Sequence, residues 1–213
     1  MRTRQAINGA LRRVPVWLAY LLGLAPAPVL LWLAATGGLG PDPVKALEHQ
    51  LGEIGLIFLV AVLAVTPLLR LTGINLMRFR RSLGLMAFWY VLFHLSCWLI
   101  LDMQFDWPEI WTDITKRPYI TIGMAAFLAM LPLALTSNDY ALRRMGAAAW
   151  RRLHRLAYFV ALAGAVHYFM LVKAWPVEPL LFLVVILLLL GLRLRWRKLH
   201  SSATLSGAAP AKR

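Results

Sequence analysis

The sequence has 213 residues, of which 61% are hydrophobic, and a mean hydropathy of +0.67. A soluble domain of this size would not carry so few charges between its apolar runs. The formal net charge of +14 would suit a nucleic-acid-binding protein, but the basic residues lie between the apolar runs rather than in one patch. Length, composition and charge therefore favour a polytopic membrane protein and argue against nucleic acid as a partner.

Six apolar runs, each near the ~20 residues that a helix needs to cross a bilayer, predict an all-α bundle of six transmembrane helices. In chain order the predicted spans are Val14–Thr36, Leu47–Leu69, Leu83–Leu101, Tyr119–Leu135, Arg152–Val172 and Val177–Leu194. The first run is longer than the apolar region of a usual signal peptide, so we expect it to be retained as a helix. Residues 1–200 are predicted to form one transmembrane domain, and residues 201–213 a disordered, basic cytoplasmic tail.

The placement of the charges predicts the orientation. Arginines cluster before span 1, between spans 2 and 3, between spans 4 and 5, and after span 6, whereas the opposite loops hold only Lys45, Lys116, Arg117 and Lys173. By the positive-inside rule both termini are expected in the cytoplasm, with the arginines near anionic lipid. The one long outer loop, Asp102–Pro118, carries four acidic residues and two tryptophans. It is either a docking face for a partner or a solvated interfacial loop.

Two histidines, His154 and His167, lie 13 residues apart in one apolar stretch. On a helix, 13 residues cover roughly 20 Å, which is most of a hydrocarbon core about 30 Å thick. The same spacing places the two rings about 60° apart around one helix. Ionisable groups inside a span are costly and point to function. The two histidines therefore suggest a path for electrons or protons across the membrane.

His94 and His167 are predicted at similar depths on different helices, roughly 12 Å and 9 Å below the outer ends of spans 3 and 5. Two imidazoles that face each other from neighbouring helices are what a bis-histidine haem needs. Zinc would need three or four protein ligands, and matching carboxylates and thiols are missing here. We therefore expect His94 and His167 to be the axial ligands of a haem iron.

The sequence leaves the roles of the other two membrane histidines open. His49, near the outer start of span 2, could be a haem ligand, a contact to a quinone, or an ordinary residue at a helix start. His154 has no histidine at its own level, so a second haem there would need another ligand. A flavin is an equally good occupant of that level, with its phosphate bound by arginines. The candidates, each of which could instead contact lipid, are Arg80, Arg81, Arg151 and Arg152.

Two further classes of protein stay open on the residues alone. A small transporter or channel would show broken helices or polar residues near the midplane, and Pro132 and Gly164 are the main hints of that kind. A scaffold without a cofactor would use its histidines as hydrogen-bonding groups between helices. The single cysteine, Cys97, excludes a four-cysteine iron–sulfur site and covalent haem attachment.

Five stretches of the sequence resemble the MsrQ (YedZ) family, which is related to the ferric reductase-like transmembrane proteins, including NADPH oxidases and STEAP reductases. The stretches are Asp42–His49, Arg80–Leu95, Ile114–Gly123, Leu133–Ser137 and Trp150–Tyr168. The resemblance implies a six-helix flavocytochrome of the bacterial inner membrane, with b-type haem and FMN. It also implies an electron-transfer subunit rather than a catalytic one, with no bond cleavage of its own.

The resemblance implies partners and site residues as well. Electrons would come from the quinone pool or a cytoplasmic flavin reductase and leave for a periplasmic molybdopterin enzyme that reduces methionine sulfoxide in damaged envelope proteins. His94, His154 and His167 match the haem-associated histidines of the family. NADPH oxidases have a second histidine on the third helix, 13 residues before the first, where this chain has Arg81. This departure favours one outer haem, with a flavin at the inner level as in STEAP reductases.

Overall fold

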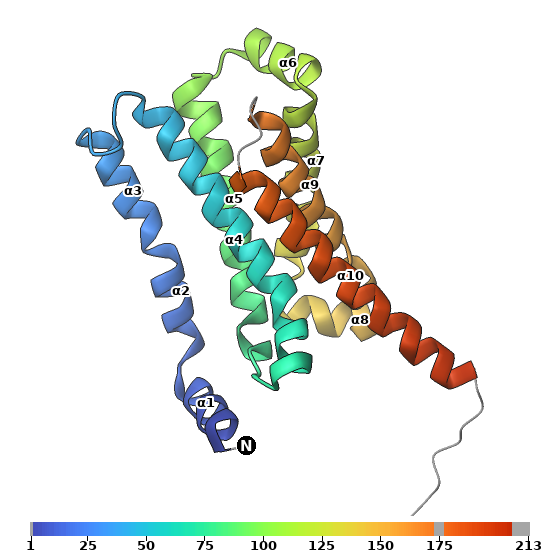
Figure 1. The fold of residues 1–213 in the computed structure, drawn as a ribbon. Coiled ribbons are helices and arrows are strands. Elements are labelled where there is room, and N and C mark those ends of the chain that lie inside the picture. The colour runs from blue at the N-terminus through green and yellow to red at the C-terminus, as the bar shows by residue number, and fades with distance from the viewer. Residues whose placement is uncertain (1, 173–176, 206–213) are drawn as a thin grey trace, which may run out of the picture.

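The structure is a computed structural model that describes residues 2–172 and 177–205, and this part of the chain is helical without a strand (Figure 1). Its elements are α1 (Arg2–Arg13), α2 (Val16–Leu24), α3 (Pro26–Ala35), α4 (Pro43–Thr72), η1 (Met77–Phe79), α5 (Arg80–Cys97), the π-helical turn η2 (Trp98–Asp102), α6 (Trp107–Lys116), α7 (Pro118–Leu135), α8 (Asp139–Leu153), α9 (Leu156–Leu171) and α10 (Val177–Leu205).

Among the described residues, five helical segments are long and apolar enough to cross a membrane. They are Val16–Ala35, Pro43–Thr72, Met77–Asp102, Pro118–Leu135 and Val177–Arg195. The predicted span Arg152–Val172 corresponds to α9, a shorter apolar helix of 16 residues. It begins at Leu156 because His154 and Arg155 form a turn after α8. The chain is a polytopic all-helical membrane protein.

The first predicted span consists of two helices rather than one. α2 ends just before Pro26, which begins α3 and has no N–H to continue the hydrogen bonding of α2. Both helices lie along one side of the bundle (Figure 1) and expose large apolar side chains, such as Trp17 and Trp32, each 64% exposed. The Tyr90 hydroxyl of α5 donates to the Gly23 carbonyl of α2 at 2.9 Å. This pair of helices therefore lies at the periphery of the bundle.

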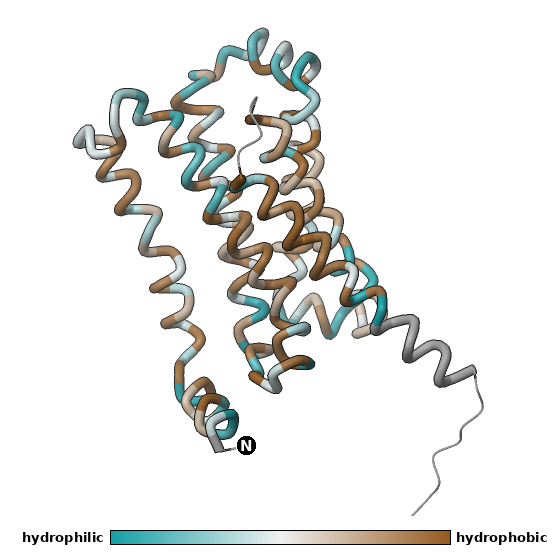
Figure 2. Tube along the Cα trace, viewed as in Figure 1, coloured by the Kyte–Doolittle hydropathy of each residue, from teal (hydrophilic) through white to brown (hydrophobic). Residues whose placement is uncertain are grey.

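The core lies where α4, α5, α7, α9 and α10 meet. Its most deeply buried apolar side chains include Leu63 of α4, Ala87 of α5, Ala161 and Ala165 of α9, and Ile186 of α10, each at most 1% exposed. Figure 2 shows the apolar residues running along the middle of these helices. The small residues of α9 let the neighbouring backbones approach closely, as is typical of helices in membranes.

Two short polar helices lie at opposite ends of the bundle (Figure 1). The predicted outer loop contains α6, whose N-cap Asp106 accepts a hydrogen bond from the Glu109 amide at 3.2 Å. The loop between the fourth and fifth spans contains α8, whose N-cap Asn138 accepts from the Ala141 amide at 2.7 Å. These caps satisfy free amides at the helix starts. We call the two ends of the bundle the α6 end and the α8 end.

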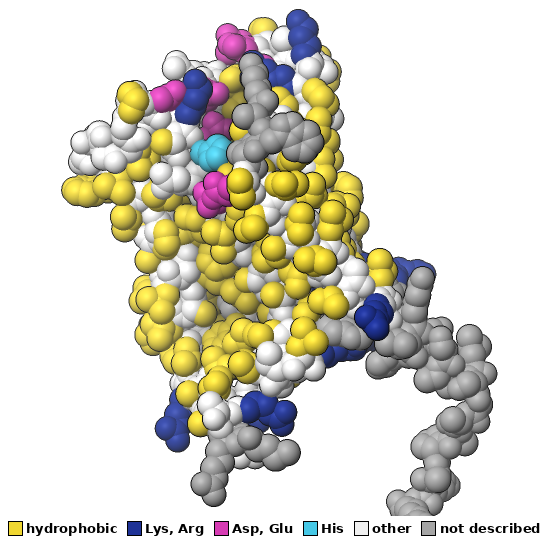
Figure 3. Space-filling view, in the orientation of Figure 1, with side chains coloured by type: hydrophobic (Ala, Val, Ile, Leu, Met, Phe, Trp, Pro, Cys, Tyr) yellow, Lys and Arg dark blue, Asp and Glu magenta, His cyan; other side chains and the backbone are white. Residues whose placement is uncertain are grey.

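Charge separates the two ends. On the face shown in Figure 3, acidic side chains gather at the α6 end, and an apolar band lies between them and the basic side chains of the opposite end. Of the nine acidic residues in the chain, Asp139 alone belongs to the α8 end. The predicted orientation, with the α8 end in the cytoplasm, stays a prediction.

The predicted tail differs in part from the structure. α10 continues to Leu205, so residues 201–205 are helical where disorder is predicted. Residues 206–213 and Lys173, which entered the charge argument, lie outside the described residues.

Candidate functional site

The structure brings His94 of α5 and His167 of α9 together near the α6 end. Their ring centroids are 6.1 Å apart, and the ring planes are inclined by 81°. Two residues from different helices, predicted at similar depths, therefore lie close together. Their role as ligands stays a prediction.

A backbone carbonyl holds each ring in place. Nδ1 of His94 donates to the Glu48 carbonyl of α4 at 2.9 Å, and Nδ1 of His167 donates to the Tyr119 carbonyl of α7 at 2.7 Å. A carbonyl oxygen can only accept, so the proton of each neutral imidazole must be on Nδ1. Each Nε2 then keeps a lone pair for a metal, which is how protein contacts usually orient ligating histidines.

A glycine makes room for each ring. A Cβ atom on Gly52 of α4 would lie 3.0 Å from Nδ1 of His94, and one on Gly123 of α7 would lie 2.8 Å from Nδ1 of His167. Each glycine is one helical turn after the residue whose carbonyl accepts the hydrogen bond. Without these glycines the imidazoles could not approach the helix backbones this closely.

The pair fits a haem better than an isolated metal ion. A bond between imidazole nitrogen and a transition metal is about 2 Å long, so two imidazoles on one metal have centroids roughly 6 Å apart. The observed 6.1 Å agrees with that separation. No group of three or more His, Cys, Asp or Glu side chains suited to a metal occurs in the described part of the chain. Two protein ligands suffice for haem because the porphyrin supplies the others.

His49 lies outside this pair. Its side chain is exposed, and its ring packs edge-on against the ring of Tyr168 at 5.2 Å. Its predicted roles, as haem ligand or quinone contact, stay predictions.

His154 is held by a separate set of contacts at the α8 end. Its ring stacks on Trp150 at 3.8 Å, and its Nε2 lies 3.1 Å from the Thr136 hydroxyl. Burial, with a smaller effect of Arg80, lowers the pKa of His154 to about 4, so the imidazole is neutral near pH 7. His154 occupies the turn before α9 and is not on one continuous helix with His167, so that part of the sequence prediction is wrong.

The four predicted phosphate-binding arginines differ in their surroundings. Arg81 forms an ion pair with Asp139, and both side chains are largely exposed. Arg151 and Arg152 are exposed on the last turn of α8. Arg80 is partly buried and lies close enough to His154 to affect it electrostatically. Of the four, only Arg80 faces the interior of the bundle.

Arg193 of α10 is a candidate that the sequence did not single out. Its Nη1 donates to the Tyr158 hydroxyl at 3.0 Å, and its Nη2 donates to the Leu63 carbonyl at 2.7 Å. In the sequence, it is one of several basic residues at the end of an apolar run, which is the ordinary sign of a helix end at a membrane surface. Only the crossing of α10 over α4 shows that its guanidinium turns inward.

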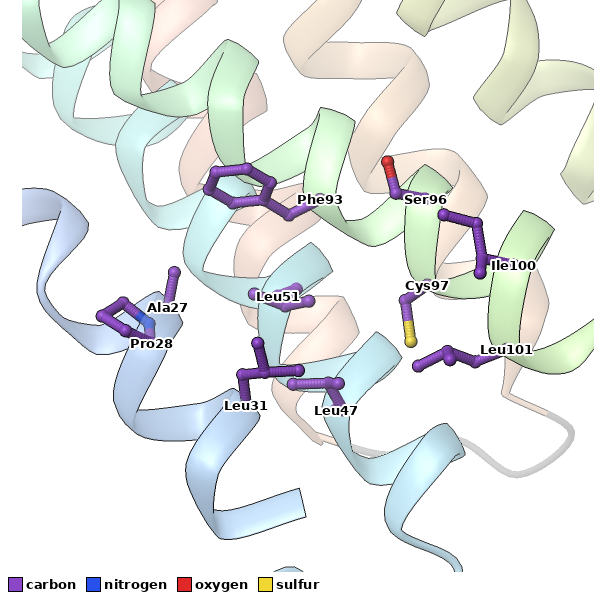
Figure 4. A pocket seen from close by; sticks show the side chains of 10 residues that line it. All are labelled: Ala27, Pro28, Leu31, Leu47, Leu51, Phe93, Ser96, Cys97, Ile100 and Leu101. Atoms are coloured by element: carbon purple, nitrogen blue, oxygen red, sulfur yellow. The ribbon is translucent and has the colours of Figure 1, made fainter. Parts of the chain in front are cut away.

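A cavity of about 420 Å³ lies near the α6 end between α3, α4 and α5 (Figure 4). Its lining is apolar except for Ser96 and the buried Cys97, and none of the histidines contributes to it. The cavity is therefore separate from the paired imidazoles.

Comparison with known proteins places the chain in a family. Residues 51–165 match the family described as ferric reductase like transmembrane component. The protein-methionine-sulfoxide reductase heme-binding subunit MsrQ of Rhizobium meliloti (strain 1021) is 44% identical over 204 residues, covering 93% of this chain and 94% of the relative. The subunit of the same name from Brucella ovis is 47% identical over 179 residues, covering 84% of this chain and 81% of the relative. No solved structure matches. The chain therefore belongs to the MsrQ family, within the ferric reductase-like transmembrane components.

Proposed function

We propose that the protein binds haem b between His94 and His167 and transfers electrons through the membrane. The observation that carries this proposal is the pair of imidazoles with centroids 6.1 Å apart, each oriented by a backbone carbonyl. The relatives are named heme-binding subunits, which supports the same conclusion.

When bound, the haem supplies one-electron chemistry that no side chain provides. The chain positions it: α5 and α9 present one imidazole each, and α4 and α7 provide the carbonyls that orient them. The apolar helices around the pair lower the local dielectric and exclude water, and both affect a redox potential.

The proposed partners follow the family. Electrons enter from the quinone pool or a cytoplasmic flavin reductase, and they leave to a periplasmic molybdopterin-containing methionine sulfoxide reductase subunit. This arrangement requires a multi-pass protein of the bacterial inner membrane that supports repair of oxidised envelope proteins. The docking surface that we propose is α6, where Trp107 and Trp111 are 65% and 70% exposed beside acidic residues.

FMN is the second cofactor that we propose, at the level of His154 near the α8 end. The support is chemical: Arg80 is partly buried there, and a guanidinium binds phosphate through two parallel hydrogen bonds. No second histidine faces His154 among the described residues, which favours a flavin over a second bis-histidine haem.

Purification from haem-sufficient cells tests the main proposal. The protein should be red, show split α and β absorption bands after reduction with dithionite, and contain one haem for each chain. Colourless protein, or a high-spin spectrum without a second axial ligand, would contradict the proposal. Flavin released by denaturation and measured by fluorescence gives the FMN content of the same sample.

A further inference from the structure

Two arginines from different helices converge on one tyrosine at the α8 end. Arg193 of α10 donates to the Tyr158 hydroxyl of α9 at 3.0 Å, and Arg80 of α5 lies close enough to both residues to interact with them electrostatically. The guanidinium of Arg193 also lies 5.3 Å from the centre of the Tyr158 ring and donates to the Leu63 carbonyl of α4 at 2.7 Å. We call Arg80, Arg193 and Tyr158 the two-arginine cluster. It occupies the junction of α4, α5, α9 and α10.

This cluster has two positive charges and no carboxylate. The one acidic residue of the α8 end, Asp139, is already paired with Arg81. Nε of Arg193 is buried and has no hydrogen-bond partner in the described part of the chain. Partly buried charges of like sign, one of them with an unsatisfied donor, are unfavourable without an anion.

We propose that the two-arginine cluster binds the phosphate group of a ligand. Two guanidinium groups provide several fixed donors that match phosphate oxygens, and the free Nε of Arg193 adds one more. The phosphate can come from FMN or from the headgroup of an anionic lipid. The flavin source rests on the proposed function; the lipid source does not.

The cluster is well separated from the paired histidines. Leu63, whose carbonyl binds Arg193, and Glu48, whose carbonyl binds His94, lie on the same helix. Their separation of fifteen positions in the sequence corresponds to roughly 22 Å along the helix axis. A change at the cluster should therefore leave the ligands of the haem in place.

The test uses the full-length protein in detergent with three variants. Arg193→Gln and Arg80→Gln each remove one charge, and Arg195→Gln removes an exposed arginine of the same helix as a control. The affinity for FMN is measured by quenching of flavin fluorescence. The affinity for lipid is measured as the shift of the unfolding temperature on adding phosphatidylglycerol, compared with phosphatidylcholine. Loss of one charge-assisted contact should weaken binding by roughly ten- to a hundredfold, while the control should match the wild type.

The two measurements distinguish the sources. Weaker FMN binding with an unchanged lipid response identifies the flavin phosphate, and the reverse identifies the lipid headgroup. Unchanged affinity for both ligands in both glutamine variants would overturn the inference. So would a wild-type protein that binds neither FMN nor phosphatidylglycerol in preference to phosphatidylcholine.

Two additions keep the test decisive. If a glutamine variant does not fold, two other measurements replace it: ligand binding by Arg193→Lys, which keeps the charge, and competition by inorganic phosphate for the ligand site of the wild type. Binding of FMN or lipid to the wild type that inorganic phosphate does not reduce would overturn the inference. The reduced haem spectrum is recorded in every sample. A missing haem with intact phosphate-dependent binding would count against the proposed function alone.

Discussion

The bundle holds its two central histidines in the same way twice, once in α4 and α5 and once in α7 and α9. In each pair, the first helix offers a backbone carbonyl near the α6 end, from Glu48 or Tyr119, and the second helix brings the histidine to it, His94 or His167. The glycine one turn later clears the space in both. The segments EHQLG and YITIG share only that glycine. Two unlike sequences thus produce one geometry, because the ring is held by a backbone carbonyl and the space for it comes from a glycine, which has no side chain.

The two pairs differ in how tightly the histidine fits. The clearance at Gly123 is smaller than at Gly52, and the ring of Tyr119 also lies 6.1 Å from that of His167. In the α4 and α5 pair, by contrast, the residue that follows Glu48 is His49, whose side chain is exposed. The α7 and α9 pair should therefore tolerate less change than the α4 and α5 pair.

Removing either histidine should have the largest effect and should erase the difference between the pairs. In His94→Ala and in His167→Ala, the low-spin haem signal should disappear completely, because each variant lacks one of two axial ligands. Absorption and electron paramagnetic resonance spectra of the purified variants measure this. His49→Ala is the control and should keep the signal. A low-spin haem that persists in both alanine variants would show that the ligands are other residues.

Adding one methyl group at each glycine should reveal the difference in tightness. Gly123→Ala should reduce the haem content more than Gly52→Ala, because the new Cβ would lie 2.8 Å rather than 3.0 Å from the imidazole. Alanine in place of glycine inside a helix otherwise stabilises by about 0.5–1 kcal/mol. Gly191→Ala, with open space around it, is the matched control and should keep its haem. Equal haem loss at both glycines would refute the predicted order.

His154→Ala should separate the two ends of the molecule. The low-spin signal of the paired histidines should remain, while the flavin content should fall because the α8 end is disturbed. The free energy of unfolding should drop by about 1–2 kcal/mol with the loss of one hydrogen bond and the stacking on Trp150. Haem and flavin analysis with thermal unfolding checks this. Loss of all haem would mean that His154 is coupled to the pair.

The ion pair between Arg81 and Asp139 should have the smallest effect. Its hydrogen bond lowers the pKa of the Asp139 carboxyl below the ordinary 3.8. The stabilisation is therefore fully present above that value and is lost as the pH falls through the lower pKa of the folded protein. Asp139→Asn should lower the unfolding temperature slightly at neutral pH, and the gap to the wild type should close in acid and in high salt. A gap that does not depend on pH would exclude the ion pair as its cause.

The sequence was sufficient to predict five of the six membrane spans and the close approach of His94 and His167. Apolar runs report burial in lipid directly, and counting residues from the helix ends placed His94 and His167 at one level. The break before α9, the two short polar helices and the inward turn of Arg193 were not predicted. These features depend on helix capping and on how the helices cross, and neither one changes the hydrophobic periodicity of the sequence.

Main-chain acceptors have a consequence for reading mutations in this protein. The oxygens that hold the two imidazoles belong to Glu48 and Tyr119, yet no side-chain substitution at either position deletes a carbonyl. A scan of side-chain substitutions at these two positions would therefore leave both hydrogen bonds untested. An amide-to-ester replacement of the peptide bond that follows each residue, at the nitrogens of His49 and Ile120, weakens these carbonyls as acceptors and would expose their part in the site.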